Sequence, residues 1–145
     1  MIKSHIINTG LSAALAKARH KDAIVICDAN MPIPSGCTEI DLSLTRGVPT
    51  LIQTMKAILN DLVAERYQVF ELMPQYNPEM YHTIQDLLPQ LEGGTISQAE
   101  LATLMPQAKA VVRTGDFGSC CTMVLYSASG MDKYIQKYNC EFKED

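Results

Sequence analysis

The sequence has no apolar stretch near the ~20 residues that a transmembrane helix needs, and it has no cluster of Lys and Arg. Its first ten residues, MIKSHIINTG, also lack the apolar core of a secretory signal peptide. The 145-residue chain carries a net charge of −4, whereas nucleic-acid binding requires a basic surface. We therefore expect one domain over residues 1–145, with no nucleic-acid partner and no membrane partner.

Several catalytic motifs are missing as well. The chain contains no G-x-G-x-x-G, no P-loop, no G-x-S-x-G and no H-E-x-x-H, which disfavours nucleotide-fold enzymes, serine hydrolases and zinc proteases. The five cysteines form no C-x-x-C pair and the three histidines are far apart, so we expect free thiols, no metal site and a cytoplasmic location. Burial as small hydrophobic side chains explains the adjacent Cys120 and Cys121 better than a redox pair does.

Helical and strand patterns alternate along the chain, which predicts an α/β fold. Apolar residues at helical spacing, with capping residues before them, predict helices near residues 8–22, 50–64, 77–88 and 97–105. β-branched or alternating apolar residues predict strands near residues 23–27, 38–44, 67–73, 108–116 and 120–127. Glu-Gly-Gly at 92–94 predicts a break, and the tail from Gly130 is expected to be a polar helix or a loose end.

The segment RHKDAIVICDANMPIPSG, residues 19–36, places a histidine just before the first apolar strand and an aspartate just after it. Ligands of open α/β sheets bind beyond the carboxyl ends of strands, which is where Asp28 is expected. Taken singly, His20 fits a helix cap and Asp28 fits a turn. Taken together, they predict one solvent-accessible pocket, in which an imidazole moves protons near neutral pH and a carboxylate orients the ring or a substrate hydroxyl.

Two blocks, H-K-D-A-I-V-I-C-D-A-N-M-P-I-P and T-E-I-D-L-S-L-T-R-G-V-P, resemble the D-ribose pyranase and L-fucose mutarotase family, and its D-ribose pyranase branch more closely. The likeness is dense over residues 11–60 and returns at A-V-V-R-T-G-D, residues 110–116. It implies a three-layer α/β/α fold with a mixed, mostly parallel sheet. It also implies an isomerase that interconverts ring forms or anomers of a ribose- or fucose-like aldose by general acid–base catalysis, without metal or organic cofactor.

The same resemblance implies roles for individual residues. His20 matches the proposed proton donor of the family, and Asp28 matches an aspartate that holds sugar hydroxyls. A Tyr-x-Asn stretch that lines the sugar site in the family corresponds here to Cys120-Cys121-Thr122, and a second family histidine falls near Gln98. Cys120, Thr122 and Gln98 are therefore the remaining candidate sugar contacts. The family also implies a ring-shaped homo-oligomer, commonly a decamer of two pentamers, in which a neighbouring subunit completes the site.

Two other functions stay open at the level of sequence. A non-catalytic sugar-binding or regulatory relative fits the replacement of the Tyr-x-Asn stretch. An unrelated α/β interaction domain fits the pattern of helices and strands alone. The intact block from His20 to Asp28 favours the enzyme over the interaction domain.

Overall fold

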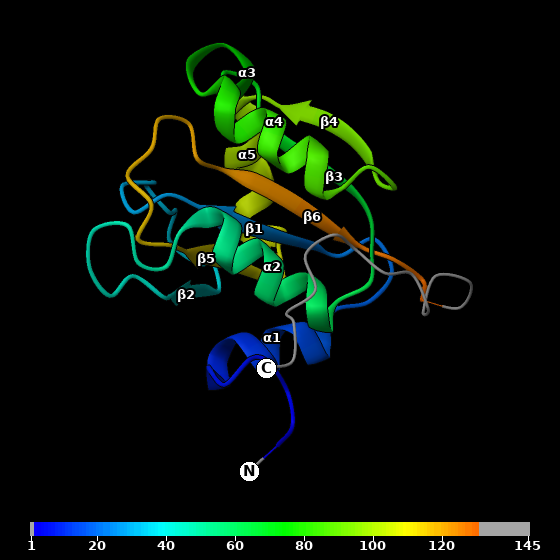
Figure 1. Cartoon of the computed structure of the whole chain (residues 1–145). Helices are drawn as coiled ribbons and strands as arrows, with labels where there is room; N and C mark the ends of the chain where they lie inside the picture. The colour runs from blue at the N-terminus through cyan, green and yellow to red at the C-terminus, as the bar shows by residue number, and fades with distance from the viewer. Residues whose placement is uncertain (1, 131–145) are drawn as a thin grey trace.

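Six strands form one mixed sheet in the order β2-β5-β1-β6-β3-β4 in the computed structural model, which describes residues 2–130 (Figure 1). The strands are β1 (Ala23–Cys27), β2 (Glu39–Asp41), β3 (Ala64–Phe70), β4 (Glu92–Ile96), β5 (Ala110–Arg113) and β6 (Met123–Ser127). The pairs β1–β5, β2–β5 and β3–β4 are parallel, and only β6 runs against its two neighbours. The prediction of a mixed, mostly parallel sheet is confirmed.

Helices cover both faces of this sheet, which gives the expected three layers. The helices are α1 (Thr9–Lys17), α2 (Leu51–Asp61), α3 (Met73–Tyr76), α4 (Pro78–Leu87), α5 (Gln98–Leu104) and the short 3-10 turn η1 (Met105–Gln107). Successive side chains of β1 point to opposite faces, so Ile24 and Ile26 pack in the core under α1, α2 and α4, while Val25 and Cys27 pack under α5 and η1. β1 is consequently buried along its whole length.

Local sequence signals set the starts of the helices. The side chain of Asn77 accepts a hydrogen bond from the amide of Met80, with Pro78 in the first turn of α4. Ser97 and Glu100 form the predicted capping box of α5, which satisfies two amides that the helix itself leaves unpaired. These helices therefore begin where the sequence predicted.

Two segments differ from the expectation. The Glu-Gly-Gly stretch is the start of β4, an edge strand that pairs with β3, and not a break. A side chain at Gly93 would approach the ring of Tyr67 to 2.6 Å, so glycine here permits close strand packing. The strand expected over 67–73 instead spans Ala64–Phe70 and is followed by α3. The expectation for the tail beyond Gly130 lies outside the described residues.

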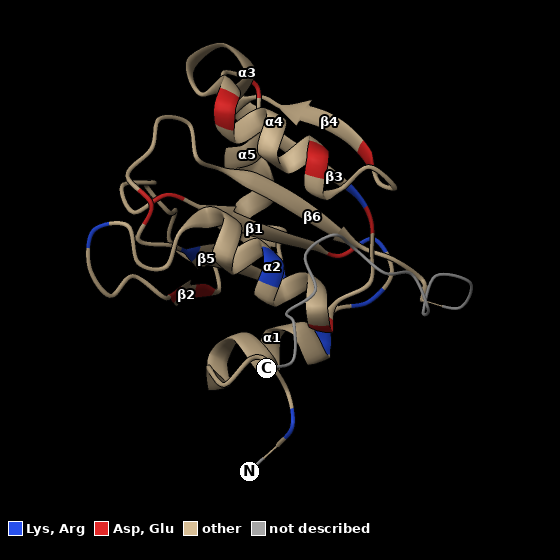
Figure 2. Cartoon of the chain, in the orientation of Figure 1, with Lys and Arg blue, Asp and Glu red and all other residues tan. Residues whose placement is uncertain are grey.

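The carboxyl ends of the five co-directional strands share one edge of the sheet, which is also where β6 begins. We call it the carboxyl edge, and the opposite end of β1 the amino edge. Charged residues of both signs are spread over many elements (Figure 2). Within residues 2–130, no helix has the length and apolar character needed to cross a membrane.

Candidate active site

Asp28 lies at the carboxyl edge, directly after β1, with its side chain partly buried. Its Oδ1 accepts a hydrogen bond from the amide of Asn30 at 2.9 Å, which closes a turn of the kind that aspartate favours. Among the described residues nothing is bonded to Oδ2. One carboxylate oxygen thus fixes the loop while the other is available to accept a hydrogen bond from a ligand hydroxyl.

Cys120 lies next to Asp28 in the loop that precedes β6. Burial raises the pKa of its thiol, and the nearby carboxylate of Asp28 raises it further. Its backbone has a φ of 57°, an uncommon value for a residue with a side chain. The structure therefore places Cys120 near Asp28, with the thiol in its neutral form.

Thr122 and Gln98 lie at the same edge on the α5 side of the sheet. Thr122 directly precedes β6, its carbonyl accepts a hydrogen bond from the amide of Phe70, and its side chain is 1% exposed. Its hydroxyl oxygen has no hydrogen-bond partner among the described residues. A buried hydroxyl without a partner is costly, by about 1–3 kcal/mol. Gln98 is exposed at the first turn of α5.

His20 belongs to a different part of the molecule, beside the amino edge. Its Nε2 lies 2.9 Å from Oε2 of Glu65 in β3, and its side chain is 48% exposed. A carboxylate only accepts hydrogen bonds, so this contact places the proton of the neutral ring on Nε2 and leaves Nδ1 as the basic nitrogen. The pair is therefore an oriented acid–base group that is open to solvent.

The pocket expected to hold both His20 and Asp28 does not form within one chain. β1 separates them, and its five extended residues span roughly 16 Å at ~3.3 Å per residue. The short connections at either end of the strand cannot offset that length. Within a chain, Glu65 orients the imidazole in place of Asp28, and a site that uses both His20 and Asp28 needs two copies of the protein.

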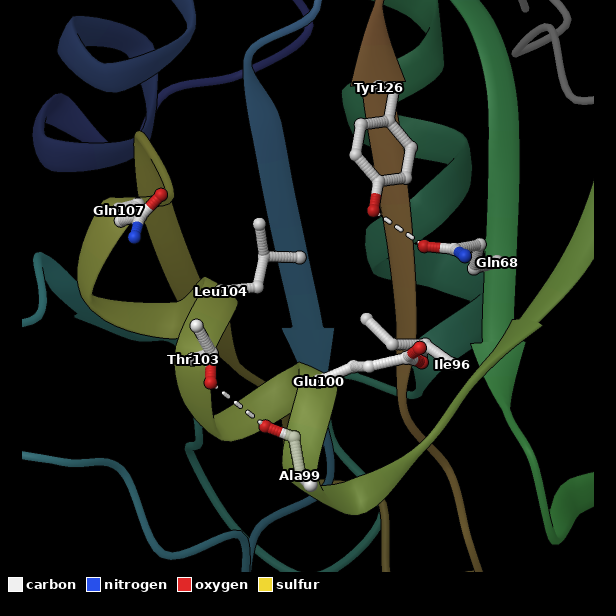
Figure 3. Close-up of a pocket in the computed structure, with 8 residues that line it drawn as sticks. All are labelled: Gln68, Ile96, Ala99, Glu100, Thr103, Leu104, Gln107 and Tyr126. Atoms are coloured by element: carbon white, nitrogen blue, oxygen red, sulfur yellow. Dashed lines mark hydrogen bonds between the residues drawn. The ribbon is translucent and has the colours of Figure 1, made fainter.

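A groove of about 500 Å³ runs along α5 (Figure 3). From the sheet, Tyr126 points toward Gln68 and donates a hydrogen bond to its side-chain oxygen. The remaining lining residues are Ile96, Ala99, Glu100, Thr103, Leu104 and Gln107. The volume suits a small ligand, but the groove includes none of the five residues expected in the sugar site. Concavity alone therefore does not locate the acid–base chemistry.

Two loops pack tightly against each other at the carboxyl edge. The amide of Gly47 donates to the carbonyl of Gly115, and the amide of Gly115 donates to the carbonyl of Pro49. A side chain at Gly115 would come within 2.3 Å of the Val48 carbonyl oxygen, so only glycine permits this approach. The carboxylate of Asp116 accepts hydrogen bonds from the amides of Leu51 and Gly118, which ties the loop to the start of α2.

Sequence reasoning missed Glu65 and the roles of Arg113 and Asp116. Glu65 meets His20 across 45 residues of sequence, and no local spacing signals that contact. Arg113 and Asp116 lie in the A-V-V-R-T-G-D block, which signalled family likeness without indicating what each residue contacts. Among residues 2–130, no group of three or more His, Cys, Asp or Glu is arranged to hold a metal ion.

Thiol labelling of the native protein should separate the cysteines into two groups. Cys27 and Cys121 are fully buried, and burial raises the pKa of each thiol to about 12, so reactive thiolate is scarce near neutral pH. Among the four cysteines of residues 2–130, partly exposed Cys37 should react first with iodoacetamide, and Cys120 more slowly because its thiol pKa is raised. Peptide mapping by mass spectrometry measures the order. Rapid labelling of Cys27 or Cys121 before unfolding would contradict this packing, whereas all five thiols should react after denaturation.

A mixed α/β sheet with a carboxylate-oriented imidazole at one edge and a free carboxylate oxygen at the other defines an α/β protein equipped for acid–base chemistry on a small polar ligand. The chain belongs to the RbsD / FucU transport protein family, whose model matches residues 1–129.

Relatives of known name cover most of the chain. It is 35% identical over 127 residues to a D-ribose pyranase of Coprothermobacter proteolyticus, covering 88% of this chain and 97% of the relative. A D-ribose pyranase of Haemophilus influenzae (strain 86-028NP) is 35% identical over 135 residues with the same coverage.

Solved structures share the fold. RbsD of Bacillus subtilis, complexed with D-ribose, has a TM-score of 0.83 at 33% identity and covers 88% of this chain and 98% of its own. A fucose mutarotase of Streptococcus pneumoniae in complex with L-fucose has a TM-score of 0.70 at 20% identity, covering 84% of this chain and 93% of its own. The latter likeness concerns the fold alone.

Proposed function

We propose that this protein is a cofactor-independent monosaccharide mutarotase or pyranase that interconverts ring forms or anomers of a ribose- or fucose-like aldose. The observation that carries the proposal is the pair formed by His20 and Glu65, whose side chains meet at 2.9 Å with the imidazole open to solvent. The D-ribose pyranases similar to this chain support the substrate class.

The chemistry needs only proton transfer. A base removes the proton of the anomeric hydroxyl, the bond between the anomeric carbon and the ring oxygen breaks, and an acid protonates that oxygen. The open-chain aldehyde rotates and closes again on either face, or through another hydroxyl. Nδ1 of His20 accepts and returns these protons, while the contact with Glu65 holds the ring in place. No atom is gained or lost, so neither an oxidant nor a metal is required by this scheme.

The carboxyl edge holds the sugar in this proposal. Oδ2 of Asp28 accepts a hydrogen bond from a sugar hydroxyl, and Thr122 lies at the same edge of the sheet. Gln98 offers an exposed amide at the start of α5, and Cys120 forms the wall next to Asp28. Several neutral hydrogen bonds and one charged acceptor suit a polyhydroxylated ligand.

A second copy completes this site, because the two functional ends of β1 cannot meet within one chain. Large apolar side chains are exposed in the segments that follow β2, β3 and β5 at the carboxyl edge, including the last residue of α3. They are Leu44, Val48, Leu72, Tyr76 and Phe117. We call this group the apolar rim. Apolar surface gathered around a polar centre is typical of an interface. The second copy presents its His20 to the sugar across this rim, within a ring-shaped homo-oligomer that we take to be a decamer.

The cytoplasm is the compartment that suits this chemistry. The four cysteines in the described part of the chain carry free thiols, two of them partly accessible. A reducing compartment keeps such thiols unpaired.

Saturation-transfer NMR on a panel of monosaccharides that includes D-ribose and L-fucose tests the function directly. Saturating one ring form should reduce the signal of another when the protein is present, because both pass through the same open chain. Exchange no faster than in buffer, with the sugar nevertheless bound, would replace the enzyme with a sugar-binding protein. Neither exchange nor binding across the panel would overturn the assignment to sugars altogether.

A further inference from the structure

The loop that carries Asp28 has little structure of its own. It runs from Asp28 to Thr38, contains Pro32, Pro34 and Gly36, and forms no helix or strand. Its internal hydrogen bonds run from the amides of Asn30 and Met31 to Asp28, the second at 3.4 Å. A loop with so few internal bonds needs outside contacts to hold one conformation.

Arg113, the last residue of β5, supplies such contacts. Its Nη1 donates to the carbonyls of Ala29 and Met31, at 2.8 and 2.9 Å. Its Nη2 donates to Oε1 of Glu39 in β2 at 2.8 Å, and the arginine side chain is only 18% exposed. One partly buried guanidinium thus joins two carbonyls just beyond Asp28 to a neighbouring strand, a geometry that the planar fork of arginine permits.

The residues that follow Arg113 hold the chain on either side of Asp28. The hydroxyl of Thr114 donates to the carbonyl of Cys27 at 2.8 Å. The amide of Ala29 donates to the carbonyl of Asp116 at 2.9 Å. The backbone immediately before and after Asp28 is therefore fixed by one short segment, residues 113–116.

We propose that Arg113 is a positioning residue that holds the loop of Asp28 so that Oδ2 faces the sugar. The inference deepens the proposed function and rests on it for the identity of the ligand. Oδ1 of Asp28 is committed to the amide of Asn30, so the direction of Oδ2 follows from the conformation of the loop. Arg113 fixes that conformation through the carbonyls of Ala29 and Met31 and does not itself touch the ligand.

Replacing Arg113 with glutamine should raise the KM for the sugar by about tenfold, because a displaced carboxylate loses its alignment with the ligand. The effect on kcat should be smaller, since His20 carries the protons. Arg113→Lys keeps one cationic donor for the two carbonyls and should recover part of the affinity. Glu39→Gln removes the charge on the other side of Arg113 and keeps both carbonyl contacts, so KM should stay near that of the parent.

A double-mutant cycle with Asp28→Asn separates positioning from general stabilisation. If Arg113 acts through Asp28, then Arg113→Gln should add little to the rise in KM that Asp28→Asn already causes. Fully additive effects on KM would overturn the inference. A lower kcat together with a lower melting temperature, at an unchanged KM, would overturn it as well.

Hydrogen exchange of the loop amides keeps the test independent of the sugar. The amides of Asn30 and Met31 should exchange faster in Arg113→Gln than in the parent, and at parental rates in Glu39→Gln. Unchanged protection in Arg113→Gln would show that Arg113 does not hold the loop, whatever the protein binds. A parent that binds no sugar, with the exchange pattern as expected, would instead count against the proposed function alone.

Discussion

Replacing His20 with alanine should lower the rate of sugar ring exchange by roughly 10²- to 10⁴-fold, which is the usual contribution of a general acid–base group. The variant removes the proton carrier and keeps Asp28, Gln98 and Thr122, which lie at the carboxyl edge. Sugar affinity should therefore change by less than about threefold, because the imidazole contributes mainly to the transition state. Saturation-transfer NMR measures the rate, and calorimetric titration measures the affinity.

Two further variants make this result specific. Glu65→Gln keeps the size of the side chain and replaces the carboxylate with an amide that can also donate, so the ring is no longer held in one orientation and the rate should fall by about tenfold. His82→Ala is the matched control. His82 is an exposed histidine on α4 whose ring lies near Gln85, and it is far in sequence from both His20 and Asp28. It should behave like the parent. Full activity of His20→Ala on a sugar that the parent converts would remove His20 from the mechanism.

Local sequence signals predicted much of the fold for a physical reason. The five residues of β1 match the apolar run that predicted them, and the capping box of α5 begins where Ser97 and Glu100 indicated. Both signals act over a few residues. β4 was missed because its pairing with β3 decides its conformation. Position 93 is a glycine because the Tyr67 ring on the neighbouring strand leaves no room for a side chain. A glycine required by a distant neighbour looks like a break in the sequence.

In the candidate site too, local features could be predicted from the sequence and contacts between distant residues could not. The expected role of Asp28 follows from its position after a buried strand, which the sequence reveals. The partner of His20 is Glu65, and the partners of the loop of Asp28 lie on β5, contacts that span 45 and more than 80 residues. One chain also places the expected acid–base group and the expected sugar contact at opposite edges. No spacing in a single chain would predict the site that we propose between two copies.

Mixing two defective variants should restore activity if the site is shared between copies. His20→Ala lacks the proton carrier and Asp28→Asn binds sugar weakly, so each alone should exchange sugar poorly. In a randomly mixed assembly at equal ratio, half of the copies supply His20 and half supply Asp28. About a quarter of the sites then hold both native residues, and activity at low sugar concentration should rise to about a quarter of the parental value.

The matched control mixes His20→Ala with Glu65→Gln. His20 and Glu65 meet within one chain, so no mixed assembly contains a copy with both residues intact, and activity should not exceed the average of the two variants. Subunits are exchanged by co-expression with two different tags and purification on both, and light scattering confirms the assembly. If doubly tagged assemblies of His20→Ala and Asp28→Asn stayed inactive, the two residues would not share a site between copies. A mass of about 16 kDa for the parent at micromolar concentration would exclude the second copy altogether.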